Sequence, residues 1–157
     1  MAMIAIDGQE VVTRVIALED AEAVAELTCQ LGYETSATKM GERIASILPL
    51  AEDHLVLVAC VDGQVVGWIE AETGRHLQSE PHTVITGLVV RDGARSVGIG
   101  SRLCADVEEW SMQRGIAVLR VTSRMTRERA HRFYLREGFV QTKASAVFEK
   151  ILSSETE

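Results

Sequence analysis

The sequence of 157 residues lacks an apolar run long enough to cross a membrane, so we expect no membrane partner. It also lacks cysteine pairs with metal-type spacing. Cys29, Cys60 and Cys104 stand apart in apolar or helical runs, which predicts three buried free thiols and no metal site. Residues 1–7 have no basic segment ahead of their short apolar stretch, so we expect no secretory signal and a cytoplasmic protein.

Basic residues are also in short supply. Lysine and arginine together number 16 against 23 acidic residues, and the formal net charge is −7. A general nucleic-acid binder has a basic footprint, so we expect no nucleic-acid partner. The acidic balance favours a cationic substrate, but it also serves solubility by itself, and both interpretations stay open.

The glycine-rich stretch Arg95–Leu103 lacks the residues that two common phosphate loops require. A Walker-type loop ends in Gly-Lys-Ser/Thr, whereas Gly100 is followed by Ser-Arg. A dinucleotide fingerprint has a third glycine three residues after the second, and that position is Leu103. The spacing that is present is Arg-x-x-Gly-x-Gly, between a β-branched run at 83–90 and a helical pattern at 101–114. Free N–H groups at the start of that helix predict an anion site.

The remaining patterns predict one domain over residues 1–157 with a mixed α/β sheet. We expect helices at 20–31, 38–48 and 127–137. We expect strands at 11–18, 55–61, 64–70, 83–90, 117–122, 139–142 and 146–152. Asp62-Gly63 predicts the turn of a hairpin, Thr73–Pro81 a polar loop, and the residues from Ser153 a frayed tail. Strand 83–90, the helix after it and strand 117–122 predict a parallel pair with a helical crossover.

A second motif follows the first at residues 130–139. Ala130-His131-Arg132-Phe133-Tyr134 is followed four residues later by Gly138-Phe139. Together with Arg-x-x-Gly-x-Gly, this pattern resembles the GNAT superfamily of acyl-CoA-dependent N-acetyltransferases. The order of the elements is similar over nearly the whole chain. The resemblance implies a mostly antiparallel central sheet with one splayed parallel strand pair, flanked by helices.

The resemblance also implies acetyl-CoA as cofactor and places its contacts by position. Its pantetheine arm would bond to the main chain of Leu88 and Val90, with Gly87 permitting a local distortion. Its pyrophosphate would meet the turn formed by Arg95, Ser96, Val97, Gly98, Ile99, Gly100 and Ser101. Arg127 stands near the pantetheine where many members have asparagine, which leaves that contact open. Three arginines, Arg129, Arg132 and Arg136, share a helix face that is either solvated or holds the 3′-phosphate.

Two proton transfers are needed for acetylation of an amine. The resemblance assigns Tyr134 to protonate the CoA thiolate, which suits a phenol of pKa about 10 beside a thiol of pKa about 8.5. The ammonium of the substrate must also lose a proton, and Thr86 stands where many members have a glutamate base. Glu70, Glu72 and His82 are the candidates for that base. The sequence does not choose among them.

The leading hypothesis is direct acetyl transfer from acetyl-CoA to a primary amine of a small cationic substrate. Two alternatives stay open, a non-catalytic acyl-CoA-binding module that has lost its base and an acetyltransferase for protein amines. The apolar segment Ala146-Val147-Phe148 also raises the possibility of a homodimer paired across this strand.

Overall fold

The computed structural model describes residues 3–6, 9–94 and 98–153 of the chain. These residues divide into two compact units, Met1–Thr122 and Ser123–Glu157, and we describe each unit by itself. No helix in the described part of the chain is both long and apolar enough to cross a membrane.

The first unit is built on a six-stranded sheet in the order β1-β2-β3-β4-β5-β6. The strands are β1 (Met3–Ile6), β2 (Gln9–Val15), β3 (His54–Val61), β4 (Gln64–His76), β5 (Ser79–Val90) and β6 (Leu119–Val121). All neighbouring strands are antiparallel except β5 and β6, which are parallel. The predicted mixed sheet with a single parallel pair is therefore confirmed.

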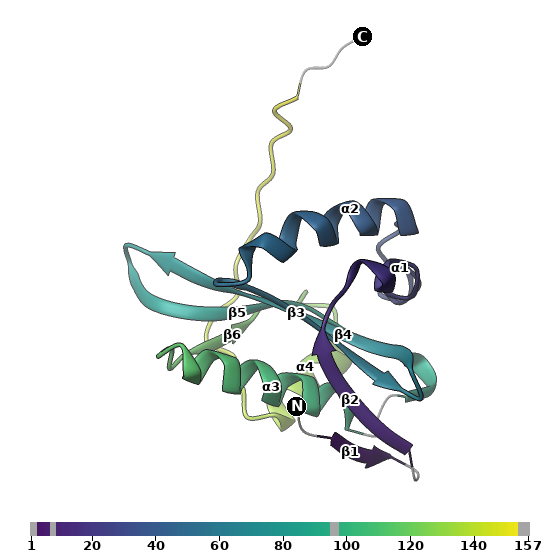
Figure 1. Cartoon of the computed structure of the whole chain (residues 1–157). Coiled ribbons are helices and arrows are strands. Elements are labelled where there is room, and N and C mark those ends of the chain that lie inside the picture. The colour runs from purple at the N-terminus through teal and green to yellow at the C-terminus, as the bar shows by residue number, and fades with distance from the viewer. Residues whose placement is uncertain (1–2, 7–8, 95–97, 154–157) are drawn as a thin grey trace. The chain divides into compact units, whose positions relative to one another are not determined.

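Helices cover both faces of this sheet. Figure 1 shows α1 (Ala21–Gln30) and α2 (Ala37–Ile47) on one face and α3 (Ile99–Gln113) on the other. Short 3-10 turns occupy Leu18–Asp20, Leu48–Leu50 and Asp92–Ala94. The first face is packed with apolar side chains of α1, α2, β3 and β4, among them Val24, Leu27, Met40, Ile44, Val56, Val58 and Trp68.

The predicted helices form because their apolar residues recur on one side. Met40 and Ile44 of α2 are buried, and Ser36 begins that helix by accepting a hydrogen bond from the Lys39 N–H at 3.2 Å. Leu103 and Val107 of α3 are completely buried. The hairpin turn is also as predicted, because Asp62 and Gly63 both have positive φ, 50° and 78°, as a two-residue turn of the primed type requires.

Thr73–Pro81 was predicted as a loop, and this prediction is wrong. β4 continues to His76 and β5 begins at Ser79, so the segment is a second hairpin, with His76 opposite Ser79. Its polar composition misled the prediction, because pairing with a neighbouring strand overrides weak strand propensity. The sequence prediction also missed β1, which pairs with β2.

The second unit contains α4 (Glu128–Arg136) and the residues that follow it. No strand forms in the described residues after α4, so the strands predicted at 139–142 and 146–152 are wrong. The apolar side chains of that segment are exposed, Val147 by 88% and Phe148 by 92%. An alternating pattern yields a strand only when a partner strand is available for pairing.

One expectation about burial also fails. Cys60 and Cys104 are buried as predicted, but Cys29 is exposed near the end of α1. In the second unit, no residue of α4 is fully buried, including Ala130 and Phe133 of the second motif.

An ion pair ties β2 to the start of α1. Arg14 donates from both terminal nitrogens to the Asp20 carboxylate at 2.7 and 2.8 Å, and the Ala17 N–H donates to the same group at 2.8 Å. The hydrogen bonds from Arg14 hold the pKa of Asp20 below its usual value, although burial acts in the opposite direction. This contribution to folding stability is therefore present above the unfolded-state pKa, about 3.8, and is lost as pH falls through the lower folded-state pKa.

We expect Asp20→Asn to lower the free energy of unfolding by about 1–2 kcal/mol at pH 7, a value moderated by the partial exposure of Arg14. Denaturant unfolding at pH 7 and near pH 3 measures the difference. The difference should be smaller at the lower pH, which is below the unfolded-state pKa of about 3.8, because the unfolded chain then binds a proton at Asp20. Glu19→Gln, at the exposed neighbouring position, is the control and should change little. An Asp20→Asn effect of equal size at both pH values would contradict this account.

Candidate active site

The candidate site begins where β5 and β6 part. Thr83, Val84 and Ile85 of β5 pair with Leu119, Arg120 and Val121 of β6, and β6 ends there. β5 continues to Val90, so its last five residues extend beyond the parallel pairing. The register between β4 and β5 shifts at the same place: Ala71 is opposite Ile85 and Glu70 is opposite Gly87. Thr86 is thus the extra residue of a β-bulge.

Beyond the bulge, the N–H and C=O groups of every second residue of β5 point away from β4. The Arg91 N–H donates to the Val66 carbonyl of β4 at 2.7 Å, and peptide groups alternate along a strand. The peptide groups of Leu88 and Val90 therefore face the side where β6 has ended. Gln30, the last residue of α1, confirms this orientation for Val90, because its Nε2 donates to the Val90 carbonyl at 2.9 Å.

Helix α3 starts close to this edge of β5. Its N-cap is Gly98, with φ +92°, a left-handed conformation that glycine adopts without strain. No acidic residue lies in the first turn, so the helix dipole at this end is not offset. At the other end of α3, the Ser111 Oγ lies 2.7 Å from the Thr83 Oγ1, which fixes the helix against β5. Arg95, Ser96 and Val97 lie outside the described residues.

Gly87 also has a close contact that the sequence did not reveal. A Cβ at Gly87 would lie 2.7 Å from the ring atoms Cη2 and Cζ3 of Trp68, which projects from β4. The bulge itself falls on Thr86, one residue earlier. Gly87 therefore makes room for the indole ring, which is 8% exposed, in the core beneath α1 and α2.

All three candidate bases lie on this same face of the sheet, because Glu70, Glu72 and Gly74, the partner of His82, alternate along β4. Glu70 is opposite Val56 of β3 and Gly87 of β5, directly beside the bulge, whereas Glu72 is opposite Val84 in the fully paired region. The Glu70 and Glu72 side chains are 26% and 50% exposed. Glu70 is therefore the candidate closest in register to the edge where β5 and β6 part.

His82, the third candidate base, is 3% exposed. Its Nδ1 lies 3.1 Å from the Glu80 carbonyl oxygen and its Nε2 lies 3.4 Å from Arg120 Nη1. Its ring stacks on that of His76 at 5.5 Å. Both ring nitrogens of His82 thus have protein neighbours, and the side chain is almost completely buried.

Sequence reasoning missed His54. This residue opens β3, and its Nε2 lies 2.6 Å from Glu70 Oε2. Sequence reasoning also missed Gln30 of α1, whose side chain donates to the Val90 carbonyl at the end of β5. Neither residue belongs to a recognisable motif, and only the three-dimensional register places them beside the predicted residues.

The second unit presents Tyr134 in the middle of α4. The Tyr134 ring makes edge contacts with the rings of Phe133 at 5.3 Å and Phe139 at 5.6 Å. The Phe139 N–H donates to the Tyr134 carbonyl at 3.0 Å, which closes the C-terminal end of the helix. Arg127 is the N-cap of α4, and its side chain is exposed.

Comparison with known proteins identifies the family. The model for the acetyltransferase (GNAT) family matches residues 14–139. The chain belongs to this family. An aminoalkylphosphonate N-acetyltransferase of Salmonella typhimurium is 35% identical over 130 residues, covering 79% of this chain and 81% of that protein. An aminoglycoside N(6′)-acetyltransferase of Stenotrophomonas maltophilia is 29% identical over 133 residues, covering 82% and 86%.

A solved structure has the same GNAT fold. An aminoglycoside N-acetyltransferase crystallised in complex with CoA aligns with a TM-score of 0.82 at 19% identity, over 94% of this chain and 99% of that one. As a GNAT protein, this chain is an acyl-CoA-dependent N-acetyltransferase that acts on amines, and acetyl-CoA is its cosubstrate.

The described residues fit acetyl-CoA. A pantetheine arm carries amide groups that need main-chain partners, and Leu88 presents both a donor and an acceptor away from β4. A pyrophosphate needs N–H donors without nearby carboxylates, as the first turn of α3 provides. These features lie in the first compact unit, residues 1–122.

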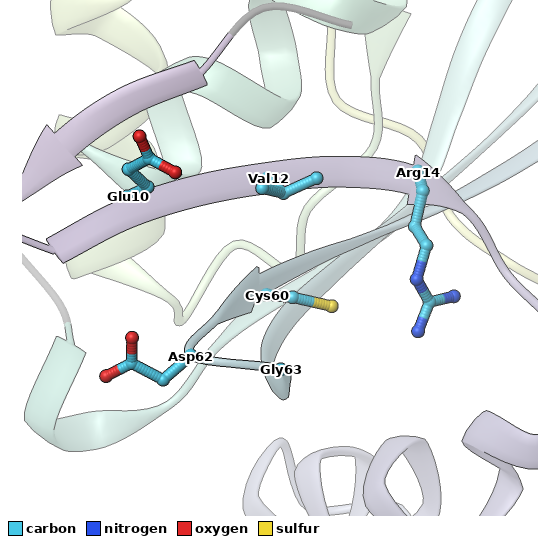
Figure 2. A pocket seen from close by; sticks show the side chains of 6 residues that line it. All are labelled: Glu10, Val12, Arg14, Cys60, Asp62 and Gly63. Atoms are coloured by element: carbon cyan, nitrogen blue, oxygen red, sulfur yellow. The ribbon is translucent and has the colours of Figure 1, made fainter.

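A surface pocket lies apart from these GNAT site residues. It has a volume of about 390 Å³ and is lined by β2, β3 and the turn after β3, through Glu10, Val12, Arg14, Cys60, Asp62 and Gly63 (Figure 2). Burial raises the pKa of the Cys60 thiol at its centre, which keeps that thiol protonated. None of the residues predicted to bind acetyl-CoA or to move protons lines this pocket.

We expect Gly87→Ala to lower the free energy of unfolding by about 1–3 kcal/mol, because its methyl group would overlap the rigid indole of Trp68. Denaturant unfolding measures the loss. Gly93→Ala is the matched control, since a Cβ there has no atom within 4 Å. Trp68→Phe should recover part of the loss in the Gly87→Ala background, because its shorter ring vacates the overlap. Equal stability of the Gly87→Ala and Gly93→Ala proteins would refute the contact.

Proposed function

We propose that this GNAT enzyme acetylates a primary amine of a small polycationic substrate, and that Glu70 accepts the ammonium proton. The observation that carries the proposal is the position of Glu70, opposite Gly87 and beside the bulge at which β5 leaves β6. Glu72 adds a second carboxylate two residues along the same strand. Two carboxylates on one face favour an acceptor with more than one positive charge.

The cosubstrate supplies an activated acetyl group as a thioester. The chain supplies the binding: main-chain groups of Leu88 and Val90 for the pantetheine arm, and N–H groups of the α3 turn from Gly98 through Ser101 for the pyrophosphate. At Val90 the carbonyl also accepts a hydrogen bond from Gln30 Nε2 at 2.9 Å. Arg95 and Arg127 remain proposed charge contacts.

Glu70 addresses the protonation problem of the acceptor. An amine with a lysine-like pKa of about 10.4 is neutral in only roughly one molecule in a few thousand at pH 7. A carboxylate within hydrogen-bond reach, or one water away, takes the proton from the ammonium, and the lone pair of the neutral nitrogen then attacks the thioester carbonyl carbon. The side chain of Glu70 is partly exposed, so the proton then passes to solvent. Tyr134 is the proposed acid for the thiolate.

The charge at the site also favours one class of acceptor over another. The two curated relatives are named for an aminoalkylphosphonate and an aminoglycoside. A phosphonate is anionic and would lie near the Glu70 and Glu72 carboxylates, whereas a polyamine or aminoglycoside would be attracted to them. We therefore propose the polycationic class.

Thiol release from acetyl-CoA tests the acceptor class. We expect kcat/KM for an aminoglycoside or a polyamine to exceed that for an aminoalkylphosphonate by about tenfold or more, which corresponds to about 1.4 kcal/mol. Raising the ionic strength should narrow the difference, because salt screens partly exposed charges. If the aminoalkylphosphonate were turned over faster than the other acceptors, the proposal of a polycationic acceptor would be wrong. If only lysine peptides were acetylated, the acceptor would be a protein amine and not a small molecule.

Glu70→Gln tests the proton acceptor. The amide keeps the size of the side chain but accepts no proton, so we expect kcat to fall about 100-fold or more with the KM for acetyl-CoA unchanged. Glu72→Gln is the matched control on the same strand. It should raise the KM of a polycation several-fold and leave kcat within about threefold. If the two variants behave alike, Glu70 has no special role.

A further inference from the structure

His54 is held between the two carboxylates of the proposed site. Its Nε2 lies 2.6 Å from Glu70 Oε2, and its Nδ1 lies 3.8 Å from Glu72 Oε2. An ionised carboxylate can only accept, so Nε2 carries the proton in the shorter contact. The imidazole is 15% exposed and therefore sits deeper than either glutamate.

The preference of His54 for Glu70 does not follow from strand pairing. In the register, His54 stands directly opposite Glu72, and Val56 stands opposite Glu70. The imidazole thus bonds to its diagonal neighbour and leaves the directly opposite carboxylate beyond hydrogen-bond distance. Diagonal neighbours lie farther apart than opposite ones on a sheet, so this contact requires a specific orientation of both side chains.

The residue before His54, Asp53, is held in place by contacts of both its main chain and its side chain. The Thr73 N–H donates to the Asp53 carbonyl at 2.8 Å. The Asp53 carboxylate lies 3.0 Å from Arg75 Nη1 and 3.5 Å from Arg114 Nη2. Asp53 therefore joins the start of β3 to β4 and to the last turn of α3, and His54 projects from an anchored position.

We propose that His54 is a positioning residue for acetyl transfer, which orients the Glu70 carboxylate by donating Nε2–H to Oε2. One oxygen of Glu70 is then occupied, and the other is directed to the ammonium proton. This inference rests on the proposed function of Glu70 as the proton acceptor. A partly exposed glutamate without such a partner samples several rotamers, and supporting hydrogen bonds of this kind are worth about 10- to 100-fold in activity.

Two substitutions separate orientation from mere packing. His54→Leu removes the donor, and we expect kcat to fall about 10- to 100-fold while the KM for acetyl-CoA stays within twofold. His54→Gln restores an N–H donor near the place of Nε2 and should recover most of that loss. His76→Leu, at an exposed histidine of the same sheet, is the control and should leave kcat unchanged. Equal losses for His54→Leu and His54→Gln would overturn the proposal.

A double-mutant cycle then shows whether His54 acts through Glu70. In the Glu70→Gln background, His54→Leu should change kcat by less than about twofold, because the group it orients is already gone. Independent, multiplicative losses would overturn the inference. If Glu70→Gln alone has no effect, the proposed function fails; if Glu70→Gln lowers kcat and His54→Leu does not, only the inference fails. Circular dichroism and CoA binding, measured on every variant, identify any loss that comes from misfolding.

Discussion

The separation of β5 from β6 is the constraint on which the site depends. A parallel pair that ended together would leave no exposed main chain between its strands. Here β6 stops at Val121 while β5 runs five residues further, and the extra residue Thr86 changes the side to which later peptide groups point. One inserted residue therefore turns the peptide groups of Leu88 and Val90 away from β4, toward the side where β6 has ended. The helix that follows is positioned by the same strand.

A second bulge, in the β3–β4 hairpin, decides which side chains meet. Next to the Asp62-Gly63 turn, Cys60 pairs with Val65. The next residue of β3, Ala59, pairs with Gly67, so Val66 is left without a partner in the register. Without this one-residue shift, His54 would stand opposite Ala71 and on the opposite face from Glu70. The bulge in the β3–β4 hairpin thus places His54 on the same face as Glu70 and Glu72. The bulge at Thr86 places Gly87 opposite Glu70 on the other side of β4.

These two irregularities explain what the sequence could and could not predict. Periodicity predicted α1, α2 and α3, and the Asp-Gly turn predicted its hairpin, because those signals are local. Spacing around Gly98 predicted the start of α3, since only a small set of residues tolerates that backbone. The register of a bulged strand depends on packing on both faces, so no local pattern revealed the contact between His54 and Glu70. Gly67 within an apolar run is a local sign of the bulge in the β3–β4 hairpin.

The incorrect predictions have the same physical origin. Residues 73–81 are polar but have a strand to pair with, whereas residues 146–152 are apolar and have none among the described residues. Composition reports what a side chain prefers, and strand formation depends on what lies beside it. The contacts of His82 show the same limit, because only the structure reveals that its ring nitrogens lie beside the Glu80 carbonyl and the Arg120 guanidinium.

The contact between Trp68 and Gly87 also gives this enzyme a built-in optical reporter. The chain has two tryptophans, and the other, Trp110, lies on α3 with its ring 4.5 Å from the Arg114 guanidinium. A Trp110→Phe chain would retain a single indole, pressed against the main chain one residue from the bulge. The emission of that indole depends on the polarity and packing of its surroundings. Any rearrangement of β5 would therefore be visible in the unlabelled protein.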